Sequence, residues 1–122
     1  MPIQSFNPVN GKLLRSFDSL TPNALEARIA IAYAAARTYA QEPVEHRVFW
    51  MRRLAALLDS DIEELAATMT AEMGKTLVSA RAEVKKCAAV CRYYAENAAG
   101  ILSDEPVKTE HAQSYVDRKS VV

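Results

Sequence analysis

The sequence predicts a mainly α-helical chain with four amphipathic helices and short β-strands at both ends. Apolar residues recur at helical spacing almost without interruption between Pro22 and Gly100, and this is the main observation behind the prediction. Short runs rich in β-branched and aromatic residues stand before and after that region. The chain has 122 residues, 50% of them hydrophobic, enough for one domain or one part of a larger domain. A complete dinucleotide-binding sheet is not expected, because the helical region leaves no room for its alternating strands.

Residues 1–20 are expected to form a hairpin-like start. Ile3–Phe6 and Lys12–Phe17 are short β-prone runs, and the dipeptide Asn10-Gly11 between them strongly favours a turn. The two runs are therefore predicted to pair with each other.

The first helix is predicted to begin at Thr21-Pro22. Threonine is a good N-cap, and proline at the first helical position loses no hydrogen bond. The helix should end near Gln41, because Pro43 disfavours helical geometry in the residue before it. Its expected apolar stripe is Leu25, Ile29, Ala32, Ala36 and Tyr39.

A second and a third helix follow. The buried line of the second is predicted to be Val44, Val48, Met51, Ala55 and Leu58. Phe49 and Trp50 are expected to widen that buried face. Ser60 and Glu63 have the spacing of a capping box, which would open the third helix, and Gly74 suits the left-handed position that closes it. The inward residues of the third helix are predicted to be Ile62, Leu65, Ala66, Met69 and Met73.

A fourth helix is predicted over Val78–Ala99, with Gly100 as its stop, so that residues 21–100 form a helical layer. Its expected buried stripe is Ala80, Val84, Cys87, Cys91, Tyr94 and Ala98. Residues 101–122 have an extended pattern and end in an apolar run around Val121. An open strand edge there would expose unpaired backbone groups, so we expect the polypeptide to continue beyond this run.

Composition and charge exclude several classes of function. Lys plus Arg and Asp plus Glu both number 15, so the chain lacks the clustered positive charge of nucleic-acid-binding proteins. No run approaches the roughly 18 apolar residues of a membrane span, and the N-terminus does not resemble a signal peptide. Only three glycines are present, far apart, so no phosphate-binding loop is expected. Two cysteines without a signal peptide indicate a cytoplasmic protein with free thiols.

The two cysteines are the first candidates for chemistry. Cys87 and Cys91 are four residues apart on the expected inward stripe of a helix. A zinc site needs three or four ligands, and the histidines, His46 and His111, are distant in sequence. We therefore expect two buried structural thiols, with a reactive or metal-binding role as the less favoured alternative.

Three motifs carry a family resemblance. The corner Glu72–Lys75, the helical run Arg92–Asn97 and the opening turn Phe6–Gly11 together resemble the N-terminal region of NAD(P)-dependent aldehyde dehydrogenases, most closely the bacterial succinate-semialdehyde dehydrogenase branch. The resemblance covers residues 1–122 and implies a partial N-terminal segment of that α/β fold. It implies that residues 101–122 lead into a further strand and a nucleotide-binding domain. It also implies NAD or NADP as the cofactor of the intact enzyme, and a homo-oligomer. The nucleophilic cysteine, the general-base glutamate and the nucleotide loop of the family are not in this chain, so it should hold no catalytic or cofactor-binding residue.

The resemblance also assigns roles to single residues. Lys86, with Ala82 one turn earlier, corresponds to the part of the family's helix that lines the aldehyde entrance tunnel. A lysine there would bind the distal carboxylate of a substrate such as succinate semialdehyde by a charge-assisted hydrogen bond. The simpler interpretation of Lys86 is a solvated helix lysine.

A second assignment concerns a monovalent cation. In some members of the family the cation lies between the opening turn and the acidic residue before the Gly-Lys corner, which correspond here to Ser5, Phe6 and Glu72. The simpler interpretation of Glu72 is an exposed pair with Lys75 at i,i+3 spacing.

Two interpretations of function follow. The chain is either part of an aldehyde-oxidising enzyme, whose remaining sequence is its partner, or a non-catalytic helical module that docks on a full-length paralogue. The reading frame beyond Val122 would distinguish the two.

Overall fold

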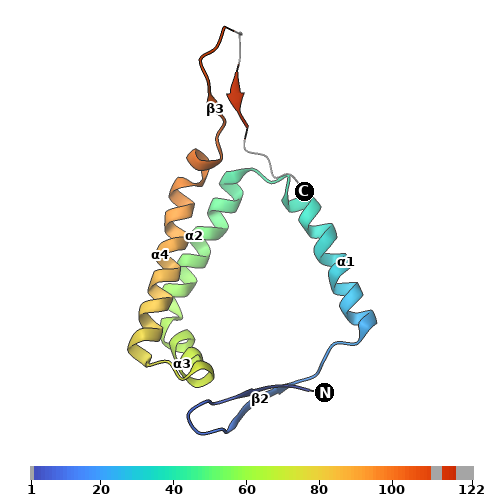
Figure 1. Ribbon diagram of the computed structural model, residues 1–122, viewed down its shortest axis with the longest axis vertical. Helices are drawn as coiled ribbons and strands as arrows, with labels where there is room; N and C mark the ends of the chain where they lie inside the picture. The colour runs from blue at the N-terminus through green and yellow to red at the C-terminus, as the bar shows by residue number, and fades with distance from the viewer. Residues whose placement is uncertain (1, 111–113, 118–122) are drawn as a thin grey trace.

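The computed structural model describes residues 2–110 and 114–117. The elements in order are β1 (Ile3–Phe6), β2 (Leu13–Phe17), α1 (Pro22–Tyr39), α2 (Val44–Ser60), α3 (Ile62–Met73), α4 (Leu77–Leu102), β3 (Glu105–Pro106) and β4 (Tyr115–Val116). The predicted class, mainly helical with short strands at both ends, is confirmed (Figure 1). Residues 111–113 and 118–122 of the expected extended tail lie outside the described residues.

The expected N-terminal hairpin is present. β1 and β2 pair antiparallel, with a register shift between Ser5 and Phe6. The turn is held by two asparagine side chains: Asn7 Oδ1 accepts from the backbone N–H two residues on, and Asn10 does the same. Gly11 has a φ of 69°, the left-handed conformation that glycine adopts without strain.

α1 begins as predicted but packs differently from the prediction. Thr21 Oγ1 accepts from the Ala24 N–H at 3.2 Å, and Pro22 occupies the first turn. The expected buried stripe is wrong: α1 has no buried residue, and Leu25 and Ile29 remain about half exposed. The physical reason is visible in Figure 1, where α1 lies apart from the other three helices and no described element covers its apolar side.

The core lies where α4 packs on α2 and α3, with α2 and α4 side by side and α3 across one end (Figure 1). Its buried residues are Ala55, Ala66, Ala80, Val84, Ala88, Cys91 and Ala95. The stripe expected for α4 is therefore partly wrong. Cys87 and Tyr94 are exposed, and Ala88 and Ala95 take the inward positions. Alanines let the helix axes approach closely, whereas the sequence pattern favoured the larger side chains.

The buried line expected for α2 is confirmed, because all five of its residues are buried or half-buried. Phe49 and Trp50 do not widen it: they are 56% and 51% exposed and contact each other edge to face. In α3 the expected inward residues are likewise buried or half-buried, apart from Met73, which is 68% exposed.

Two helix boundaries differ from the predictions. Ser60 does not cap α3: it ends α2, and its Oγ donates to the Leu57 carbonyl at 3.0 Å, because only Asp61 separates the two helices. Gly100 does not stop α4, which continues to Leu102. Gly100 has no positive φ, so the helix passes through it without the turn that a terminal glycine makes.

The glycine that closes α3 was predicted correctly, and the hairpin contacts the corner that it forms. Gly74 closes α3 with a φ of 68°. Ser5 Oγ donates to Glu72 Oε1 at 2.7 Å, which joins β1 to the last turn of α3. A Cβ built on Gly74 would lie 3.1 Å from Pro8 Cγ, so the hairpin turn rests directly against this corner.

Replacing Gly74 with alanine is expected to lower the free energy of unfolding by about 1–2 kcal/mol, the cost of a left-handed backbone for a residue with a Cβ. The contact with Pro8 should add to that loss. Urea unfolding followed by circular dichroism measures the effect. Gly100→Ala is the matched control: no atom lies within 4 Å of its Cβ position, and α4 should gain up to about 1 kcal/mol. Equal effects of the two substitutions would contradict the prediction.

The chain exposes far more surface than a compact protein of its size. Its accessible area is 10185 Å², whereas a compact protein of 13.5 kDa exposes about 6,500 Å². Within the described part of the chain, no helix is both long enough and apolar enough to cross a membrane. Large apolar side chains of α1 contribute to the exposed area of the chain: Leu25 is 48%, Ile29 52% and Ile31 70% exposed.

Candidate functional site

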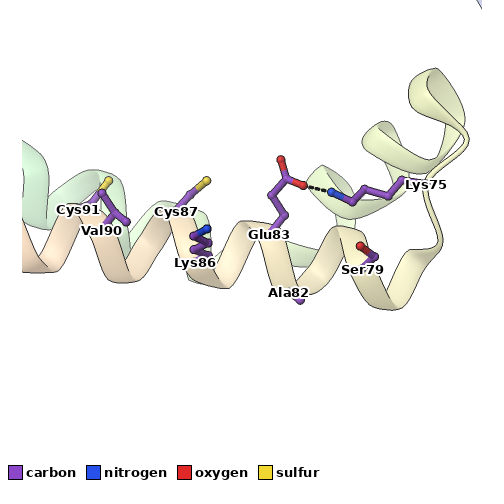
Figure 2. A pocket seen from close by; sticks show the side chains of 8 residues that line it. All are labelled: Lys75, Ser79, Ala82, Glu83, Lys86, Cys87, Val90 and Cys91. Carbon is purple, nitrogen blue, oxygen red and sulfur yellow. Dashed lines mark hydrogen bonds and ion pairs between the residues drawn. The ribbon is translucent and has the colours of Figure 1, made fainter.

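A groove of about 670 Å³ runs along the outer side of α4 and contains both residues expected to line a tunnel (Figure 2). Its lining residues are Lys75, Ser79, Ala82, Glu83, Lys86, Cys87, Val90 and Cys91. All but Lys75 come from α4, at intervals of three and four residues that place them on one side of a helix.

Local structure explains how Lys75 reaches this groove. The left-handed Gly74 reverses the chain at the end of α3, and Thr76 then caps α4 by accepting from the Ser79 N–H at 3.3 Å. Lys75, in the corner between the two helices, folds back over the first turns of α4 and pairs with Glu83 (Figure 2).

The groove carries a positive charge. The pKa of Glu83 is lowered, first by the hydrogen bond from Lys75, then by the charge of Lys75, with a smaller contribution from Lys86. The ion pair thus stabilises the fold above the unfolded-state pKa of Glu83, and this contribution is lost as the pH falls through the lowered folded-state pKa. Two ammonium groups face one carboxylate, so the groove keeps one positive charge at neutral pH.

The Lys86 ammonium is available for a ligand. Lys86 is exposed, and it forms no ion pair or hydrogen bond within residues 2–110 and 114–117. Ala82 lies one turn away in the same groove, and Val90 adds an apolar side chain on the other side. This arrangement can bind a small anion with a short apolar body, through a charge-assisted hydrogen bond.

Two interhelical ion pairs connect α4 to its neighbours. Arg81 donates to both carboxylate oxygens of Glu63, with Nη2 to Oε2 at 2.6 Å, and Arg92 Nη1 donates to Asp59 Oδ2 at 2.6 Å. The hydrogen bond from Arg81 lowers the pKa of Glu63, and the same bond raises the pKa of Arg81. These pairs are exposed and add little stability, and they link α4 to α3 through Arg81 and to α2 through Arg92.

The second expected site is assembled only in part. The hydrogen bond between Ser5 and Glu72 brings these two residues together, and Phe6 follows Ser5 at the register shift of β1. Hydroxyl and carboxylate oxygens are ligands that hard cations accept. The hydrogen bond from Ser5 to one oxygen of Glu72 also has a structural role, because it joins β1 to α3. No group of three or more histidine, cysteine, aspartate or glutamate side chains suited to a metal occurs among the described residues.

Two expectations about this region are wrong, and one residue of the groove was missed. Lys75 pairs with Glu83 rather than with Glu72. Cys87 is exposed, so only Cys91 is a buried thiol. Glu83 was missed as a residue of the groove, because its partner lies eight residues away and meets it only through the Gly74 corner. The one signal in the sequence is that Glu83 lies one turn before Lys86.

Known proteins resemble this chain over nearly its whole length. The model of the aldehyde dehydrogenase family matches residues 1–121. Succinate-semialdehyde dehydrogenase [NADP(+)] 1 of Mycobacterium tuberculosis H37Rv is 43% identical over 106 residues, which are 87% of this chain and 23% of the relative. A probable succinate-semialdehyde dehydrogenase [NADP(+)] of Synechocystis is 37% identical over 116 residues, 95% of this chain and 26% of the relative.

Solved structures agree. Succinic semialdehyde dehydrogenase from Streptococcus pyogenes, in complex with NADP+, superposes with a TM-score of 0.83 at 30% identity, over 92% of this chain and 25% of that chain. Gox0499 superposes with a TM-score of 0.85 at 29% identity, over 93% of this chain and 25% of that chain. The chain thus spans about a quarter of the length of the proteins it matches. The expected family resemblance and the expected partial α/β fold are both confirmed.

Proposed function

Because the chain belongs to the aldehyde dehydrogenase family, we propose that it is the N-terminal part of an enzyme that oxidises succinate semialdehyde to the carboxylic acid with NAD(P)+. The observation that carries the choice of substrate is the unpaired Lys86 ammonium in a groove with one excess positive charge. The relatives whose names include succinate semialdehyde support the same choice.

The proposed role of Lys86 is to bind the substrate's carboxylate, not to take part in the oxidation. The aldehyde end would lie beyond the groove, where sequence outside this chain supplies the nucleophile and the cofactor. Ala82 is small and leaves space beside Lys86, so a short four-carbon chain can pass along α4. NAD(P)+ would accept the hydride in the intact enzyme, and the names of the relatives favour NADP+.

The rest of the enzyme would also complete the packing of this chain. The remainder of the same polypeptide is proposed to cover the exposed apolar faces of α1 and α4. The intact enzyme is proposed to be a cytoplasmic homo-oligomer.

The 122-residue chain alone is expected to oxidise no aldehyde, because its sequence contains neither the nucleophilic cysteine motif, nor the general-base glutamate, nor the nucleotide loop of the family. The measurement is NAD(P)H formation from succinate semialdehyde by the purified chain, with an intact relative as the positive control. Aldehyde-dependent NAD(P)H formation that co-purifies with the chain would contradict the prediction, provided that the activity is lost when Cys87 and Cys91 are replaced with serine.

The exposed face of α1 also fits the second interpretation, a helical module that docks on a full-length paralogue. Sequencing the gene beyond Val122 separates the two. Continuation into nucleotide-binding and catalytic motifs supports the enzyme, whereas a stop codon directly after Val122 supports the module.

The cation assignment is tested separately. We propose that Ser5, Phe6 and Glu72 bind a monovalent cation in the intact enzyme. Potassium should then raise the melting temperature of the enzyme more than an equal concentration of tetramethylammonium, and Glu72→Gln should abolish the difference. An unchanged difference in Glu72→Gln would contradict the assignment.

A further inference from the structure

The two cysteines share one side of α4 although their exposure differs. Cys87 is exposed and Cys91 is 9% exposed, and both line the groove. Figure 2 shows their sulfur atoms projecting from the same side of the helix, one turn apart. The sequence predicted two buried structural thiols, whereas the structure exposes Cys87.

The spacing of Cys87 and Cys91, four residues apart on a helix, allows both sulfur atoms to bind one metal ion. Cβ atoms at positions i and i+4 of a helix are about 5–6 Å apart. A thiolate lies about 2.3 Å from a bound metal ion, so the sulfurs of a linear two-coordinate centre are roughly 4.6 Å apart, within reach of such a pair.

The absence of a third ligand selects the kind of ion. No further histidine, cysteine, aspartate or glutamate joins the two thiols into a larger group within the described residues. A tetrahedral zinc site is therefore unsuitable, whereas Cu(I) is a soft ion that prefers thiolate ligands. We propose that Cys87 and Cys91 form a two-thiolate binding site for Cu(I).

Charge supports this assignment. Binding converts Cu⁺ and two thiols into a Cu(SR)₂⁻ centre and releases two protons, with no change of oxidation state. The product carries one negative charge, and the groove has one excess positive charge from Lys75 and Lys86 against Glu83. Because the neighbouring cations stabilise the anionic centre, the site favours the bound state in a way that two isolated thiols would not.

The test is an anaerobic titration of the reduced 122-residue chain with Cu(I) in competition with bathocuproine disulfonate. The wild-type chain is expected to take up one Cu(I), and X-ray absorption should show two sulfur neighbours. Cys87→Ser should weaken binding by about 100-fold or more, because the second thiolate acts at a high effective concentration. Cys87 is exposed, so this variant should retain the helical circular dichroism of the wild type.

The matched control is the double variant Cys87→Ala/Ala89→Cys. It keeps two thiols per chain but places them two residues apart, on nearly opposite sides of α4, and Ala89 is exposed. Its affinity for Cu(I) is expected to fall as far as that of Cys87→Ser. Equal affinity of wild type and either variant, or no uptake by the wild type, would overturn the proposal. None of these measurements depends on aldehyde oxidation, so their outcome is independent of the proposed function.

Discussion

Lys86→Met in the intact enzyme is expected to lower kcat/KM for succinate semialdehyde. The expected loss of transition-state stabilisation is about 1.5–3 kcal/mol, the range for hydrogen bonds to charged groups. That range corresponds to a factor of roughly 10–150. The loss should appear mainly in KM, because a distal carboxylate is bound about equally in the ground state and the transition state. Methionine preserves the length and apolar stem of the lysine and removes its charge, so the substitution isolates the charge.

Two comparisons keep this prediction specific. For an uncharged aldehyde of similar length, kcat/KM of Lys86→Met should fall little or should rise, because the groove becomes more apolar. Lys85→Met is the matched variant: Lys85 is also an exposed lysine of α4 but does not line the groove, and its loss should leave both substrates unaffected. Equal changes for the charged and the uncharged aldehyde in Lys86→Met would show that Lys86 is an ordinary surface lysine.

Ala88→Leu is expected to destabilise the chain by about 1–3 kcal/mol, the cost of forcing extra methylene groups into a packed core. Ala88 has no exposed surface and lies on the face that α4 turns toward α2 and α3. Leucine and alanine differ little in helix propensity, so the loss reports the close contact between helices. The midpoint of urea unfolding, followed by circular dichroism, measures it.

Ala89→Leu is the control for this core prediction. Ala89 is the next residue of the same helix and is exposed, so the added side chain meets solvent. Its unfolding midpoint should stay near that of the wild type. If both substitutions lower the midpoint equally, the result contradicts close packing of α4 against α2 and α3 at Ala88.

The sequence could predict which residues of the candidate site lie together only when they belong to the same helix. Lys86 and Ala82 share a side of one helix, and helical periodicity alone places them together. The charge of their groove was not predictable, because Lys75 and Glu83 meet through the corner at Gly74. Sequence spacing suggested an i,i+3 pair with Glu72 instead, and the hydroxyl of Ser5, 67 residues away, takes that carboxylate.

The sequence by itself determined the elements of this protein. The Asn-Gly turn, the Thr-Pro start of α1 and the left-handed glycine after α3 act through local backbone preferences, so short-range patterns suffice to predict them. The family was likewise visible in three short motifs, and the match of residues 1–121 to the aldehyde dehydrogenase family confirms it.

Only the tertiary structure decided which faces are buried. Periodicity shows that a helix has an apolar side, but not which of two adjacent rows meets a neighbour; on α4 the row of Ala88 and Ala95 is buried, and the row of Cys87 and Tyr94 is exposed. The reason is that burial depends on how closely two helices approach, and small side chains allow the closest approach. The same dependence leaves no residue of α1 buried, although the helix has an apolar stripe. Amphipathicity is a property of one helix, whereas burial depends on the surface that covers it.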